Sequence, residues 1–194
     1  MARSPDPAVR LALIEAAAQL MADEGPAALS IRRVAAEVGT STMAVYTHFG
    51  SKEDLVHEVV REAFARLHAE MVAVARTEDP VADLVAAGDA YRRNALSNAH
   101  LYRVMFSVNP LALTNPAAPD VPPGIGLDAF GDMVSAVTRC VDAGVLVGEP
   151  RHIALQIWAT AHGAVSLELS GFLGADGRET FEAAVAATFL GLSP

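Results

Sequence analysis

Cysteine and long apolar runs are almost absent from this 194-residue sequence, and each absence excludes a class of protein. Cys140 is the only cysteine, so the chain cannot form an intramolecular disulfide, and its helical surroundings favour a buried structural thiol. No apolar run reaches the roughly 20 residues that a membrane-spanning helix needs. The first 20 residues contain Asp6 and Glu15 and lack the cleavage pattern of a signal peptide. We therefore expect a soluble, cytoplasmic protein.

Basic residues are also scarce. Lysine and arginine together number 14 against 23 acidic residues, the net charge is −9, and Lys52 is the only lysine. An acidic chain is at first sight a poor partner for a polyanion. The acidity is concentrated beyond residue 76, however, where six basic residues stand against thirteen acidic ones, whereas residues 1–76 hold eight and ten. A nucleic-acid partner therefore stays open for the N-terminal part.

The motifs of common enzyme classes are missing as well. The sequence has no Ser-His-acid arrangement with a nucleophile elbow, no His-Glu-x-x-His motif, no P-loop and no dinucleotide fingerprint. Gly124 and Gly126 follow a proline-rich segment and not a strand, and His162 lacks a second ligand at metal-binding spacing. We predict that the protein is not an enzyme and holds no cofactor and no metal, and we keep a helical enzyme only as an alternative.

Helical periodicity is what the sequence has in abundance. Hydrophobic residues make up 52 % of the chain and recur at helical spacing in almost every segment. Gly25-Pro26 ends the first such segment, and residues 109–124, with five of the eleven prolines, predict a loop. No alternating strand pattern and no internal repeat is visible. We predict an all-α fold of about nine helices, the later ones over residues 51–76, 80–97, 100–107, 125–143, 151–172 and 179–192.

The stretch SIRRVAAEVGTSTMAVYTHFGSKEDL, residues 30–55, predicts two short helices in succession. Ser30 is a good N-cap, and apolar residues follow it at i, i+3, i+4 and i+7: Ile31, Val34, Ala35 and Val38. Gly39 tolerates positive φ and ends this helix after about two turns. Thr40 or Ser41 can cap a second short helix, and Ser51 opens a long one through a capping box. Such a helix-turn-helix can be short because only the N-terminal end of a recognition helix enters a major groove about 12 Å wide.

A long, gap-free run of residues connects this pattern to a known family. The run is Val34-Ala35-x-x-Val38-Gly39-x-Ser41, then Val45-Tyr46-x-His48-Phe49-x-Ser51-Lys52-x-x-Leu55, with Ala16-Ala17-x-x-Leu20-x-x-x-x-Gly25 upstream. Through this run, residues 9–55 resemble the DNA-binding domain of the TetR family of bacterial transcription regulators. The resemblance implies a three-helix DNA-binding domain over residues 1–55, joined by the long helix to a helical ligand-binding and dimerisation domain over residues 56–194. It also implies a homodimer on double-stranded operator DNA, with palindromic half-sites about one helical turn apart.

Candidate DNA contacts follow from the same residues. The front of the second short helix carries small or hydroxyl-bearing side chains, which suit close approach to a base edge, a thymine methyl group or a phosphate. Carried over by position, the groove-facing candidates are Thr40, Ser41, Thr42, Ala44 and Thr47, and the phosphate-contacting candidates are Tyr46, His48, Lys52 and either Arg32 or Arg33. Met43 is also at the front of this helix, but it stands where the family usually has a small residue, so we do not include it among the candidates for base contact. Arg3 and Arg10 could reach a minor groove or lie in solvent.

The C-terminal part offers candidates for a ligand pocket. The string Trp158-x-x-x-His162-Gly163 resembles the Trp-x-x-x-His-Gly (WHG) motif that names one TetR C-terminal subfamily, and in this family the C-terminal part binds a small molecule. The pocket candidates are Tyr91, Tyr102, Met105, Phe106, Phe130, Met133, Trp158 and His162, although each also suits a plain core. We expect Arg92 and Arg93 to be solvated; the alternative is that they neutralise an acidic ligand.

The last two predicted helices are the candidates for the dimer interface. Both have wide apolar faces, and the final one carries Phe181, Val185, Phe189 and Leu192 at helical spacing. Together these features predict a ligand-responsive DNA-binding regulator, expected to be a repressor that a small molecule releases from its operator. The alternative from a different class is a helical adaptor whose N-terminal module binds protein and not DNA.

Overall fold

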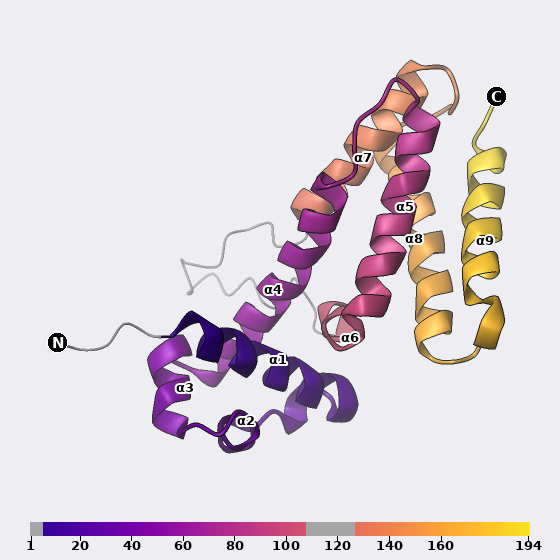
Figure 1. The fold of residues 1–194 in the computed structure, drawn as a ribbon. Coiled ribbons are helices and arrows are strands. Elements are labelled where there is room, and N and C mark those ends of the chain that lie inside the picture. The colour runs from indigo at the N-terminus through magenta and orange to yellow at the C-terminus, as the bar shows by residue number, and fades with distance from the viewer. Residues whose placement is uncertain (1–5, 108–126) are drawn as a thin grey trace. The chain divides into compact units, whose positions relative to one another are not determined.

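The computed structural model describes residues 6–107 and 127–194, and the fold is all-α within them (Figure 1). Nine α-helices and two short 3₁₀ helices, without a strand, make up these described ranges, which confirms the predicted fold class. In chain order they are α1 (Pro7–Glu24), η1 (Pro26–Ala28), α2 (Ile31–Glu37), α3 (Thr42–Phe49), α4 (Lys52–Val72), α5 (Pro80–Ser97), α6 (Ala99–Ser107), α7 (Leu127–Asp142), α8 (Pro150–Leu169), η2 (Gly174–Asp176) and α9 (Gly177–Gly191). Arg3 and the predicted loop over residues 109–124 lie outside the described residues.

The described residues form two compact units. The first holds residues 6–65 and 98–107, and the second holds residues 66–97 and 127–194, so the long helix α4 contributes to both. The sequence predicted a DNA-binding domain that ends at residue 55. This boundary concerns function and not compactness, so it stays a prediction. In the described part of the chain, no helix has the length and apolarity needed to cross a membrane.

The core of the first unit is a small cluster of aliphatic side chains from α1 to α4. Leu13 and Ile14 of α1, Val34 of α2 and Val45 of α3 are at most 1 % exposed, and Leu55 of α4 is fully buried. Helix α6 returns against α1, where His100 Nε2 lies 2.6 Å from Glu15 Oε2. The burial of one stripe per helix explains why helices as short as α2 and α3 are stable here, since tertiary packing and not propensity fixes them.

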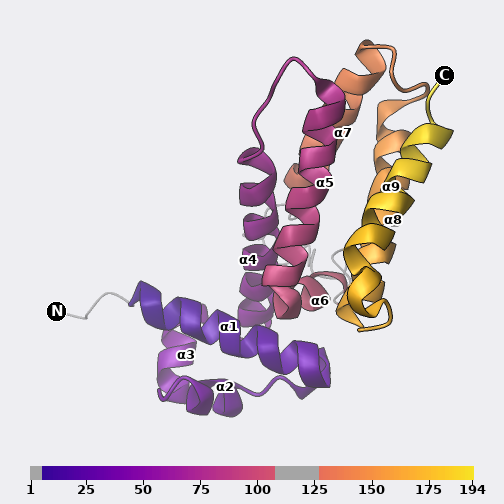
Figure 2. The ribbon, with the colours of Figure 1, turned by 45° about the vertical axis from the view of Figure 1, so that its right-hand side comes forward.

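In the second unit, α5, α7, α8 and α9 run alongside one another (Figure 2). Their shared core contains Leu84, Met133, Val137, Cys140, Leu146, Ile153, Ala154 and Ile157. Cys140 is fully buried, as the sequence predicted, and burial raises the pKa of its thiol. Its Sγ donates a hydrogen bond of 3.3 Å to the carbonyl of Pro80.

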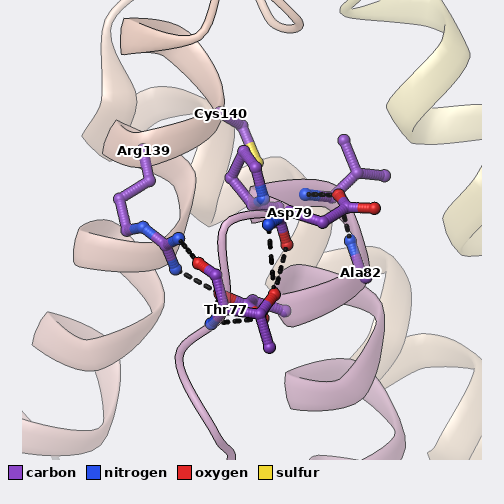
Figure 3. A network of polar contacts seen from close by, with 8 residues as sticks. Thr77, Asp79, Ala82, Arg139 and Cys140 are labelled. Carbon is purple, nitrogen blue, oxygen red and sulfur yellow. Dashed lines mark hydrogen bonds and ion pairs between the residues drawn. The ribbon is translucent and has the colours of Figure 1, made fainter.

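A polar network joins the start of α5 to α7 (Figure 3). The Asp83 carboxylate accepts hydrogen bonds from the backbone N–H of Thr77 at 2.9 and 3.1 Å and from the Thr77 hydroxyl at 2.7 Å. It also forms an ion pair with Arg139 of α7, whose guanidinium in addition donates to the Thr77 carbonyl. The hydrogen bonds from Arg139 and Thr77 lower the pKa of Asp83 to about 2. The segment between α4 and α5 is thereby fastened to α7.

Candidate nucleic-acid interface

The turn between α2 and α3 has the geometry that the sequence predicted. Gly39 adopts a φ of 69°. Its N–H donates to the Ala36 carbonyl at 3.1 Å, and the N–H of Thr40 donates to the Ala35 carbonyl at 2.8 Å. These two bonds satisfy carbonyls that the end of α2 would otherwise leave open. The chain then reverses toward α3 in a fixed conformation.

Ser41 starts α3. Its hydroxyl oxygen accepts a hydrogen bond from the Ala44 N–H at 3.1 Å, as an N-cap side chain does. The structure therefore gives Ser41 a role in building the helix, and a contact to DNA stays a prediction for this residue. Thr40, just before it, is half-buried.

Helix α3 has one buried and one exposed side. Val45 and Phe49 are 0 and 7 % exposed and anchor the helix in the core of the first unit. The other predicted DNA contacts on this helix lie outside that stripe: Thr42, Tyr46 and Thr47 are exposed, and Ala44 and His48 are half-buried. Met43, to which we assigned no contact, is 71 % exposed. These predicted contacts thus lie on the part of α3 outside its buried stripe, and their contact with DNA stays a prediction.

Three of the predicted phosphate contacts, Tyr46, His48 and Lys52, lie in the second half of α3 and the first turn of α4. Ser51 caps α4 by accepting from the Asp54 N–H at 2.9 Å, and this places Lys52 in the first turn of α4. The Nδ1 atom of His48 is buried and has no hydrogen-bond partner among the described residues, so its Nε2 is the ring nitrogen left for an outside partner. Tyr46 is 48 % exposed.

The two arginines of α2 differ in their surroundings. Arg33 donates to both carboxylate oxygens of Glu24, at 2.8 and 2.5 Å, and this pairing raises the pKa of Arg33 and lowers that of Glu24. Arg32 is exposed and forms no ion pair within the described residues. Of the two candidates, Arg32 is the one whose charge is available to a phosphate.

Arg10 contacts other residues of the protein, which the sequence did not predict. Its guanidinium stands 5.4 Å from the centre of the Phe49 ring and forms an ion pair with Glu58 of α4. Glu58 also pairs with Arg61. Arg10 therefore joins α1, α3 and α4, and neither the minor groove nor free solvent describes its place. No sequence pattern indicated this, because the three residues that meet are far apart in the chain.

Comparison with known proteins agrees with this geometry. A family model described as "Bacterial regulatory proteins, tetR family" matches residues 13–59, and one described as "Tetracyclin repressor-like, C-terminal domain" matches residues 84–188, more than half of the chain. The chain belongs to the TetR family. As a TetR-family protein it is a helix-turn-helix transcriptional regulator. The WHG subfamily stays a prediction, because the matching C-terminal model is described only as tetracyclin repressor-like.

This TetR-family chain is similar to a transcriptional regulator and to several solved structures. The HTH-type transcriptional regulator Rv1816 of Mycobacterium tuberculosis (strain ATCC 25618 / H37Rv) is 27 % identical over 199 residues, which cover 84 % of this chain and 82 % of that protein. A solved structure of a protein with unknown function from Rhodococcus sp. RHA1 is 27 % identical and covers 100 % of both chains with a TM-score of 0.77. A putative TetR-family regulator from Shewanella sp. PV-4 is 18 % identical, with a TM-score of 0.75 over 96 % of this chain and 98 % of that one, and shows the fold alone.

The structure divides the predicted pocket residues of this TetR-family chain between the two units. The first unit holds Tyr102, Met105 and Phe106, and of these Tyr102 and Met105 are buried. The Phe106 ring packs edge-on against the rings of Tyr102 and Phe64, with ring centres 5.1 and 6.5 Å away. The other five belong to the second unit: Tyr91, Phe130, Met133, Trp158 and His162. The first group forms part of a core, and its role in a pocket stays a prediction.

Within the second unit, two pairs of these residues are in contact. The Tyr91 hydroxyl lies 3.3 Å from His162 Nδ1, and His162 Nε2 lies 3.5 Å from the Ser166 hydroxyl. Burial lowers the pKa of His162, which favours the neutral ring. The ring centres of Phe130 and Trp158 are 5.4 Å apart. These contacts bring polar and aromatic side chains together in the second unit, and their role in a ligand pocket stays a prediction.

Arg92 and Arg93, which follow Tyr91 in the chain, differ in their surroundings. Arg92 is not solvated, because it donates to both oxygens of Glu168 in an ion pair whose side chains are each only 15 % exposed. Arg93 is exposed, as expected, and forms an ion pair with Glu70 at the surface.

A cavity of about 440 Å³ lies near the α4–α5 connection and is lined by residues such as Glu70, Thr77 and Asp89, but by none of the pocket candidates. The described residues contain no group of three or more His, Cys, Asp and Glu side chains that could hold a metal ion.

Proposed function

We propose that this TetR-family regulator represses transcription by binding a palindromic operator as a homodimer through α3. The observation that carries the proposal is the state of α3 itself. The helix is capped at Ser41 and anchored by Val45 and Phe49, and its opposite face is exposed. A helix held in this way can enter a major groove while the preceding helix fixes its angle. Tyr46, Lys52 and Arg32 then supply contacts to phosphates on either side.

A second copy of the chain is the partner proposed for the outer faces of α8 and α9. Leu155 and Leu167 on α8 and Leu190 on α9 are 40, 45 and 72 % exposed. Small residues share these exposed faces: Ala159, Gly163, Ala183, Ala186 and Ala187. Such a surface suits the close approach of two helix pairs in a four-helix interface. The apolar residues that we named from the sequence are not this surface, because Phe181 is buried and Val185, Phe189 and Leu192 pack against the core of their own unit.

A small molecule is the proposed effector, and the region around Tyr91, Trp158 and His162 is its proposed site. Because α4 contributes to both units, a ligand that favours one conformation of the second unit can change the affinity of the first for DNA. We place the protein in the cytoplasm, where bacterial chromosomal DNA lies. We propose no catalytic role, since a family of transcriptional regulators is not an enzyme class.

The proposal is tested by selection of DNA from the source genome. Purified protein is mixed with sheared genomic DNA, and the retained fragments are sequenced and then used to screen small molecules for release. We expect the fragments to share an inverted repeat and to be retained less well as salt rises, because phosphate contacts release counterions. The variant Lys52→Ala should retain the same fragments more weakly. A folded protein that retains no sequence in preference to others would contradict the proposal and favour the adaptor alternative.

A further inference from the structure

Helix α3 contains none of the side chains that read bases by paired hydrogen bonds. Its sequence is TMAVYTHF. Guanine is read in this way by Arg or Lys and adenine by Asn or Gln, and the cytosine amino group donates to Glu or Asp. A recognition helix of this composition has to obtain its base specificity from apolar contacts and single hydrogen bonds.

Several of the polar groups at this helix are either hydrogen-bonded within the protein or buried. The Thr47 hydroxyl donates to the Met43 carbonyl at 2.8 Å, so its donor is used and its methyl group is left for an outside partner. The Ser41 hydroxyl oxygen holds the Ala44 N–H, and the Nδ1 atom of His48 is buried. These commitments reduce the hydrogen bonds that α3 can offer to bases.

Met43 is the large apolar side chain that this face presents. At 71 % exposed it exceeds Leu11 and Tyr46, the other exposed large hydrophobic residues of the first unit, which are 44 and 48 % exposed. With about 100° of rotation per residue, Met43 and Thr47 lie opposite the buried stripe of Val45 and Phe49. The centre of the exposed face therefore consists of a thioether and a methyl group.

We infer that Met43 is a specificity-determining residue that contacts the 5-methyl group of thymine in each operator half-site, with the Thr47 methyl beside it. The inference rests on the proposed function, in which α3 enters the major groove. The thymine methyl is the apolar feature that a base pair displays in that groove. A flexible, polarisable thioether adapts its shape to such a contact. The operator therefore carries a T·A pair under this face of α3.

Replacing thymine by deoxyuridine tests the inference, because the two bases differ only in the 5-methyl group. Operator duplexes from the genomic selection are made with single deoxyuridine substitutions, and their affinities are measured by fluorescence anisotropy. For wild-type protein we expect a loss of about fourfold per contacted methyl at one or two positions in each half-site. Deoxyuridine in the flanking sequence should change nothing. For Met43→Ala the sensitive positions should bind equally well with thymine and deoxyuridine.

Two variants serve as controls. Met43→Leu keeps an apolar side chain and should keep the deoxyuridine effect, and Tyr46→Phe should weaken binding at every sequence without removing that effect. Far-ultraviolet circular dichroism confirms that each variant is folded. Selective binding that tolerates deoxyuridine at every position, or a full deoxyuridine effect in Met43→Ala, overturns the inference and leaves the proposed function intact. Loss of all preference for the operator over a shuffled sequence contradicts the proposed function itself.

Discussion

Arg10 shows how one residue can hold the end of α3 through contacts within the protein. Its guanidinium lies over the ring of Phe49, the last residue of α3, and beside Glu58 of α4. A cation over an aromatic face and an ion pair that is partly shielded from water each contribute modestly to stability. Together they bind the end of α3 to the two helices that flank it.

We expect Arg10→Ala to lower the free energy of unfolding by about 1 kcal/mol, because it removes both contacts at once. Arg61→Ala is the matched control, since Arg61 pairs with the same Glu58 but only as a surface neighbour three residues away. It should cost no more than about 0.5 kcal/mol. Urea denaturation measures both values, and equal losses would show that the contact with Phe49 contributes nothing.

At the scale of helices, glycine decides where two elements end or meet. The sequence predicted that α8 continues to residue 172, because Phe172 extends its apolar stripe. The structure ends α8 at Leu169, since Gly171 adopts a φ of 79° and the N–H of Phe172 turns back to the Leu167 carbonyl at 3.1 Å. Phe172 is 80 % exposed as a result.

Gly177 is needed for a different reason, which is space. It has a helical φ of −55°, but a Cβ at this position would stand 2.5 Å from Cδ of Glu168, the partner of Arg92. Gly177→Ala should therefore displace the carboxylate and lower the free energy of unfolding by about 1–2 kcal/mol. Gly131→Ala in α7 is the control, because a Cβ there meets nothing within 4 Å. That variant should be more stable by about 0.5–1 kcal/mol. Thermal or urea denaturation measures both variants. If both are more stable than wild type, the steric explanation for Gly177 is ruled out.

The network around Asp83 predicts a pH dependence of stability. Its pKa is lowered from 3.8 to about 2 in the folded protein, so the ionised carboxylate stabilises the fold. That stabilisation is complete above about pH 4 and is lost as the pH falls toward 2. Asp83→Asn should therefore be less stable than wild type at pH 7, and the difference should narrow below about pH 4. Urea denaturation at several pH values measures this difference in unfolding free energy, with Asp142→Asn, at an exposed carboxylate at the end of α7, as control. A difference that is constant down to pH 2.5 would contradict the assignment.

Local signals predicted the elements of this fold well. Gly25, Gly39 and the cap at Ser51 placed the boundaries of the first four helices, because helix ends depend on neighbouring residues in the sequence. Contacts between distant residues were not accessible in this way. The pairs Arg92–Glu168 and Arg10–Phe49, and the division of the pocket candidates between two units, depend on how helices pack. An apolar stripe indicates burial but does not name the partner that buries it.

For the molecule as a whole, the proposed recognition of a palindromic operator depends on dimerisation. The outer face of α9 exposes Leu190 and three alanines, and a monomer gains nothing from this apolar surface. Two recognition helices on one dimer are also what a palindromic operator requires.

Leu190→Glu should convert the dimer to monomer, because it would bury a charge without a partner in the interface. Val147→Glu is the control, since Val147 is 62 % exposed and lies outside α8 and α9. Light scattering after gel filtration gives the mass of each variant. A monomeric wild type, or a Leu190→Glu variant that remains dimeric, would move the interface to another surface.

Fluorescence anisotropy with the selected operator and a shuffled duplex of the same composition tests whether this protein recognises a specific operator. Wild-type protein is titrated into each duplex at several salt concentrations. A regulator of the kind described here should prefer the operator, bind it with at least two protomers per site, and lose affinity steeply as salt rises. A folded dimer that binds both duplexes equally, or neither of them at low salt, would contradict the account.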